Sequence, residues 1–163
     1  MGDERAAFDG LVSRLDYPMY VVTTAAGGER AGCLVGFATQ CSIDPPHYLV
    51  CVSKRNHTHR VAAAATTLAV HVLPAARRDL AELFGGETGD EVDKFARCAW
   101  REGPDGVPVV DGNAGWFAGR VLARHDLGDH TGLLVEPVGG EAGAGRDLVT
   151  FDAVRDLEPG HEA

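Results

Sequence analysis

The stretch Gly36 to Pro46 combines small, hydroxyl and amide side chains between two apolar segments. Small side chains let a flat heterocycle approach the backbone closely, and exposed N–H groups then bond its acceptor atoms. Such donors stabilise the negative charge that develops when a ring accepts hydride. Thr39, Gln40 and Ser42 add side-chain donors. The same pattern is also typical of an ordinary strand connection that ends in a Pro-Pro pair, so both interpretations stay open.

A second polar run, Ser53 to Thr58, follows an apolar stretch and precedes an alanine-rich one. Backbone amides at a helix start, with Lys54 and Arg55 beside them, are typical of an anion site. The alternative is a solvated loop in which Asn56 or Thr58 caps the helix.

The third candidate is Gly128-Asp129-His130-Thr131. A histidine held by a turn at the mouth of a cleft can donate to a nicotinamide or its phosphates, although the same residues are typical of a turn that begins a strand. The run Asp93-Lys94-Phe95 is compatible with one turn of an amphipathic helix.

His57 and His59 form the only close histidine pair, and no Cys or carboxylate completes a zinc spacing, so we predict no metal site.

Length and charge restrict the class of protein. The chain has 163 residues, 45% of them apolar, which predicts one domain over residues 1–163, with a core over about 17–138 and a loose tail over 158–163. A net charge of −9 without a basic run longer than two residues argues against nucleic acid as a partner. No run approaches the ~20 apolar residues of a membrane span, and the N-terminus lacks the apolar segment of a signal peptide. We interpret the four cysteines as reduced, mostly buried thiols, as expected in the cytoplasm.

The apolar and turn patterns predict the elements that position these residues. A helix is expected over Glu4 to Leu15, with Phe8, Leu11, Val12 and Leu15 on one face, and Ala38 to Pro46 is expected to be irregular. A further helix is expected over Ala75 to Phe84, with Gly85 as its C-cap. The expected strands are Met19–Thr24, Arg30–Phe37, Tyr48–Ser53 (buried on both faces), Leu68–Leu73, Trp116–His125, Thr131–Val138 and Leu148–Phe151.

These strands are joined mostly by turns rather than by regular strand–helix alternation. That order favours a mainly β fold with short helices, an antiparallel barrel rather than a Rossmann sheet. The absence of a Gly-x-Gly-x-x-Gly run supports the same choice.

Several short motifs occur in a fixed order: Ser42-Ile43-Asp44-Pro45-Pro46 before the strand from Tyr48, then Leu80 to Phe84, Gly106-Val107-Pro108-Val109, and Gly128-Asp129-His130. Together they resemble the flavin reductase-like family, which has the FMN-binding split-barrel fold, over roughly Tyr17 to Val138.

The resemblance implies a homodimer of six-stranded antiparallel Greek-key split β-barrels with FMN or FAD near the dimer interface. It implies that the flavin ring and ribityl chain meet Ala38, Thr39, Gln40, Cys41 and Ser42. The phosphate end would be received by Ser53, Lys54, Asn56 and Thr58, and Phe84, Lys94 and Phe95 would close the site. Asp129 and His130 would lie on the nicotinamide side, with His130 as the catalytic candidate. The Gln40-Cys41 centre departs from the serine-rich or threonine-rich loop of the family.

The activity implied by the resemblance is an NAD(P)H:flavin oxidoreductase, in which NADH or NADPH donates hydride and a flavin-dependent monooxygenase consumes the reduced flavin. Three alternatives are weighed beside it. They are a non-catalytic flavin-binding electron carrier, a deazaflavin-dependent reductase of the same fold, and a small hydrolase with Cys41 as nucleophile.

Overall fold

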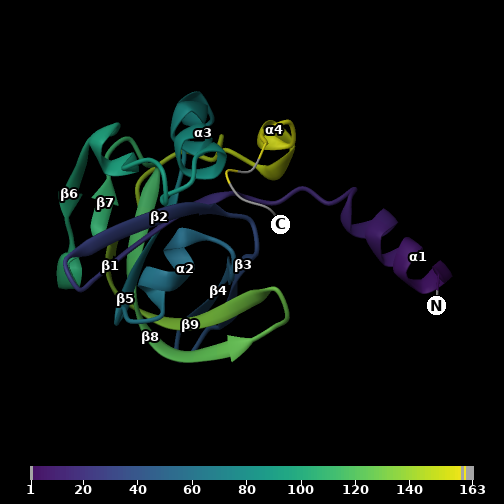
Figure 1. Cartoon of the computed structure of the whole chain (residues 1–163), viewed down its shortest axis with the longest axis horizontal. Helices are drawn as coiled ribbons and strands as arrows, with labels where there is room; N and C mark the ends of the chain where they lie inside the picture. Colours follow the sequence, from purple (N-terminus) through teal and green to yellow (C-terminus); the bar gives the residue numbers. More distant parts are fainter. Residues whose placement is uncertain (1, 159, 161–163) are drawn as a thin grey trace.

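A computed structural model describes residues 2–158 and residue 160 (Figure 1). The strands are β1 (Tyr20–Ala26), β2 (Glu29–Val35), β3 (Ala38–Ser42), β4 (His47–Ser53), β5 (Thr67–Val72), β6 (Trp100–Glu102), β7 (Pro108–Val110), β8 (Gly115–Asp126) and β9 (His130–Glu141). The α-helices are α1 (Gly2–Val12), α2 (His57–Ala62), α3 (Arg78–Gly86) and α4 (Phe151–Val154). Three 3-10 turns are η1 (Ala75–Arg77), η2 (Lys94–Ala96) and η3 (Pro104–Gly106).

Seven strands form one antiparallel sheet in the order β2-β1-β5-β8-β9-β4-β3, and β6 pairs with β7 in a small second sheet. The large sheet curves around α2, which lies against β1 and β2 (Figure 1). A mainly β, antiparallel fold with short helices is therefore confirmed. The main sheet holds seven strands instead of the expected six.

The seventh strand comes from the segment that was expected to be irregular. Ala38–Ser42 forms β3, which pairs with β4 through Ala38↔Val50 and Gln40↔Tyr48 and has an irregularity before Ser42. The expectation was wrong because β3 is an edge strand, which can expose polar side chains without an apolar face on both sides. Only the last part, residues 43–46, is a turn.

Strand β4 was expected to be buried on both faces, and this was also wrong. Val50 and Val52 are buried, whereas Leu49 and Cys51 are only partly buried. Only one face of β4 packs on the core, because the strand lies next to the edge of the sheet.

The C-terminal segment belongs to the core, which therefore extends past the expected limit at residue 138. Val149 and Val154 are buried in the cluster that packs β1 against α3. The strand expected over Leu148 to Phe151 is reduced to two isolated bridges, Pro74↔Leu148 and Pro18↔Thr150, and α4 follows. Most of the expected loose tail, residues 159 and 161–163, lies outside the described residues.

Helix α1 extends away from the body of the protein (Figure 1). The helix ends at Val12, so Leu15 lies outside the expected apolar face, and none of the helix residues is buried. The segment after η1 also differs from expectation, since α3 runs through Gly85 to Gly86 and Glu87 is its C-cap. The four cysteines are free, but only Cys33 is buried. None of the helices in the described part of the chain is long and apolar enough to span a membrane.

Candidate functional site

A cavity of about 220 Å³ lies where β2, β4 and β9 meet. The end of β2 leads into Gly36 and Phe37, the end of β4 brings Ser53, and the first residue of β9 is His130. The backbone N–H of Cys51 donates to the carbonyl of Phe37 at 2.9 Å, which fixes the chain at the cavity mouth. The cavity is lined by Tyr17, Met19, Cys33, Leu34, Val35, Gly36, Phe37, Cys51, Ser53, Asn56, His130 and Phe151.

His130 is oriented by its neighbour in the chain. Its Nδ1 lies 2.6 Å from Oδ1 of Asp129. This hydrogen bond lowers the pKa of the Asp129 carboxyl, so the carboxylate accepts and Nδ1–H donates. Nε2 is then the ring nitrogen left for a ligand, where it can accept a hydrogen bond, or donate one when the ring is protonated.

The run Ser53 to Thr58 is divided by the structure. Ser53 and Asn56 line the cavity, but Oδ1 of Asn56 accepts from the backbone N–H of Thr58 at 3.0 Å, which makes Asn56 the N-cap of α2. Thr58 is buried. Lys54 pairs with Asp126, the last residue of β8, with Nζ 2.7 Å from Oδ1. The cation is therefore near the cavity but already has a carboxylate partner.

A second cavity of about 290 Å³ lies beside the first one. The two share Met19, Leu34, Asn56 and Phe151 as lining residues. Phe84 lines the second cavity and is also part of the core. Together the two cavities form an elongated cleft between β2, α3 and the C-terminal segment.

An aromatic row runs along this cleft. The Phe37 ring lies 5.2 Å from the His130 ring and 6.5 Å from the Tyr17 ring, measured between centroids. Tyr17 stacks on Phe151 at 5.0 Å, and the guanidinium of Arg155 lies 4.6 Å from the centre of the Phe151 ring.

Lys94 and Phe95 are not brought to this cleft. They line a separate cavity of about 360 Å³ with His57 and Asp90. The Lys94 ammonium is buried and donates to the carbonyls of Gly32 and Phe84, at 2.9 Å each. Burial lowers the pKa of this ammonium. The buried ammonium therefore links β2 to α3 through these two hydrogen bonds.

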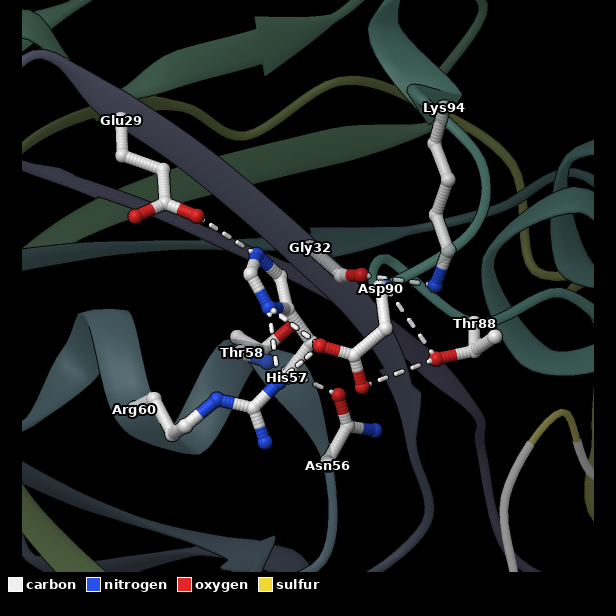
Figure 2. A network of polar contacts seen from close by, with 9 residues as sticks. All are labelled: Glu29, Gly32, Asn56, His57, Thr58, Arg60, Thr88, Asp90 and Lys94. Carbon is white, nitrogen blue, oxygen red and sulfur yellow. Dashed lines mark hydrogen bonds and ion pairs between the residues drawn. The ribbon is translucent and has the colours of Figure 1, made fainter.

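Figure 2 shows the polar network beside Lys94. His57 lies between two carboxylates, with Nε2 2.9 Å from Glu29 and Nδ1 3.2 Å from Asp90. Arg60 also pairs with Asp90. These contacts connect α2 to β2 and to the segment that follows α3. Among residues 2–158 and 160, no group of three or more His, Cys, Asp or Glu is arranged to hold a metal ion.

The five residues of β3 do not line the cleft either. Thr39, Gln40 and Cys41 are exposed, and Ala38 packs against the core. The Gln40 side chain donates to the carbonyl of Ser42 at 3.1 Å, and Gln40 lines another cavity together with Tyr48. Within one chain, the ring-sized cavity begins one residue before β3, at Phe37.

Sequence reasoning missed Tyr17, Leu34, Phe37, Cys51 and Phe151. Phe37 had a visible signal, because it is the one aromatic residue in a run of small and polar residues. The other four come from different elements, and only tertiary packing brings them together: Leu34 lies on β2, Cys51 on β4, Tyr17 before β1 and Phe151 in α4.

The cleft fits a ligand that combines planar rings with polar groups. Its walls are aromatic and aliphatic, and a few polar groups, namely the Ser53 hydroxyl, the Asn56 amide and the His130 imidazole, converge on it. This composition is typical of sites for cofactors and other small molecules. The residues present are therefore compatible with a flavin and a nicotinamide.

Comparison with known proteins shows which family the chain resembles. The family model of the flavin reductase like domain matches residues 12–156. A protein from Ancylobacter novellus named FMN reductase (NADH) RutF is 31% identical over 147 residues, which cover 90% of this chain and 81% of that protein. Another of that name from Methylorubrum extorquens is 32% identical over 127 residues, and the match spans only 62% of its length. The solved structure of the NADH:FAD oxidoreductase SgcE6 from Streptomyces globisporus has a TM-score of 0.83 at 26% identity, and the match covers 94% of this chain and 91% of that one.

Proposed function

The chain belongs to the flavin reductase like domain family, and from this premise we propose that it catalyses hydride transfer from NADH to FMN or FAD. The relatives named FMN reductase (NADH) support NADH as the hydride donor. The observation that carries the proposal is the cleft in which Gly36, Phe37, Ser53 and His130 meet, because it offers ring-sized apolar walls beside an oriented imidazole.

The chain's own residues bind and orient in this reaction rather than exchange protons. The bound flavin supplies the ring that accepts hydride. The Asp129 carboxylate accepts a hydrogen bond from Nδ1–H of His130, which fixes the tautomer of the ring and leaves Nε2 for the ligand. Ser53 lines the first cavity and Asn56 lines both cavities, so a sugar or phosphate group of a bound cofactor would lie beside them. Apolar walls from Met19 and Leu34 exclude water from the reacting rings.

We also propose that β3 contacts the flavin, and this contact requires a second copy of the chain. Within one copy, the side chains of Thr39 and Cys41 are exposed on the edge of the sheet and do not reach the cleft. A homodimer of split barrels would place another surface against this edge. Two features support a homodimer, namely the unpaired side of β3 and the uncovered apolar face of α1. A flavin-dependent monooxygenase remains the proposed consumer of the reduced flavin.

The decisive experiment is the oxidation of NADH by the purified protein, followed by the loss of absorbance at 340 nm with and without FMN or FAD. Flavin-dependent oxidation is the expected result, and NADPH serves as the comparison donor. The proposal fails when neither nicotinamide is oxidised in the presence of either flavin.

A further inference from the structure

Phe37 is unusually exposed for a large aromatic residue. Its side chain is 56% exposed at the mouth of the 220 Å³ cavity, and it belongs to none of the core clusters. Phenylalanine is usually buried, so an exposed ring in a cleft calls for a binding explanation. Its backbone is fixed by the hydrogen bond from Cys51, so the ring is presented from a rigid position.

The neighbouring rings support Phe37 from one side. Tyr17 is engaged with Phe151, whose ring also carries the Arg155 guanidinium. The backbone N–H of Phe151 donates to the carbonyl of Tyr17 at 2.8 Å, which ties the C-terminal segment to this stack. Tyr17 and Phe151 are thus occupied by each other, and Phe37 is the ring of the row with a large exposed surface.

The size of the cavity indicates which ring Phe37 receives. Sites for whole cofactor-sized ligands measure about 300–1,000 Å³. At about 220 Å³, the cavity beside His130 is smaller than such a site and has room for a single six-membered ring. The neighbouring cavity of about 290 Å³ offers room for the rest of a dinucleotide.

We propose that Phe37 is the stacking platform for the nicotinamide ring of NADH, beside His130. This inference rests on the proposed function, because it takes NADH as the ligand. One face of the nicotinamide packs on Phe37 and the other remains open to the flavin. Aromatic stacking on a planar ring stabilises binding, so loss of the Phe37 ring should weaken NADH binding about tenfold, which corresponds to about 1.4 kcal/mol.

Binding is measured without flavin, so that no turnover occurs. Titration calorimetry compares NADH with ADP-ribose, which lacks the nicotinamide ring, and a separate titration uses FMN fluorescence. Phe37→Leu removes the aromatic ring but keeps an apolar side chain, and Phe37→Tyr restores the ring. Leu122→Ala is the matched control, because Leu122 is an exposed apolar residue that lines neither cavity of the cleft.

The expected result is a Kd for NADH raised about tenfold in Phe37→Leu, near the wild-type value in Phe37→Tyr and Leu122→Ala, and unchanged Kd values for ADP-ribose and FMN. The proposal is overturned when Phe37→Leu weakens ADP-ribose or FMN as much as NADH, or when the wild-type protein binds NADH no more tightly than ADP-ribose. Failure of the proposed function is seen separately, as absence of flavin-dependent NADH oxidation.

Discussion

The Lys54 ammonium lies 2.7 Å from the Asp126 carboxylate, so an ion pair joins the end of β4 to the end of β8 beside the cleft. The ammonium also lowers the pKa of Asp126. The Asp126 side chain is largely exposed and that of Lys54 is partly exposed, so the pair contributes little to stability. It nevertheless engages the ammonium that was expected to receive a phosphate.

We predict that Asp126→Asn tightens FMN binding about two- to threefold at low salt, because Lys54 is then free to approach the phosphate. The gain should vanish at 1 M salt, where screening acts within about 3 Å. Flavin fluorescence titrations at two salt concentrations measure both effects. Asp3→Asn on α1 makes the same change in net charge far from the cleft, and an equal gain in that variant would refute the local explanation.

The Asp129–His130 pair predicts a graded loss of activity. His130→Gln should lower kcat/KM for NADH by about tenfold or more, because the oriented imidazole is lost. Asp129→Asn should lower it less, because the ring stays in place but loses its charged acceptor. Steady-state kinetics check both variants. His125→Gln changes an exposed histidine of the same hairpin and should retain wild-type kinetics; a similar loss there would assign the effect to the hairpin as a whole.

His71 makes the stability of the fold depend on pH. Its Nδ1–H donates to the carbonyl of Val21 at 2.8 Å, and its Nε2 accepts from the N–H of Val110 at 3.0 Å, so the buried ring is neutral. Burial lowers the pKa of His71 to about 4, compared with about 6.5 in an unfolded chain. The contribution of the neutral His71 ring to the free energy of unfolding is complete above pH 6.5. It falls as the pH decreases from 6.5 towards 4, because the unfolded state binds the proton first.

Urea unfolding at pH 7 and pH 5 measures this contribution. His71→Gln does not titrate, so its free energy of unfolding should decrease by about 2 kcal/mol less than that of the wild type between the two pH values. His125→Gln should behave as the wild type. If the free energy of unfolding depended equally on pH in the wild type and in His71→Gln, groups other than His71 would cause that dependence.

The uncovered face of α1 predicts a dimer contact. Phe8 and Leu11 are more than half exposed, and an isolated helix of 11 residues is only marginally stable in water. Leu11→Glu should therefore shift a dimer towards the monomer, as measured by light scattering after size exclusion. Ala6→Glu places the same charge on the opposite face of the helix and should leave the mass unchanged. A wild-type monomer, or a dimer insensitive to Leu11→Glu, would contradict the prediction.

The sequence alone determined the local elements with clear patterns. The β1–β2 hairpin follows from β-branched runs around Gly27-Gly28, and Asn56 as the cap of α2 follows from its position before an alanine-rich run. The order of short motifs led to the family, and the family model matches over the same region. The sequence left the cap open between Asn56 and Thr58, and the structure shows Asn56. These features depend on residues close together in the chain, so local patterns and turn chemistry indicate them.

Only the tertiary structure decided which residues share the cleft. Ala38–Ser42 is polar enough to be a loop, but pairing with β4 makes it an edge strand and leaves Phe37, just before it, at the cavity mouth. Lys94 was expected to close the site, but packing buries it against two backbone carbonyls. Phe151 reaches the cleft from over a hundred residues away. Such contacts depend on long-range packing, which no local pattern in the sequence encodes.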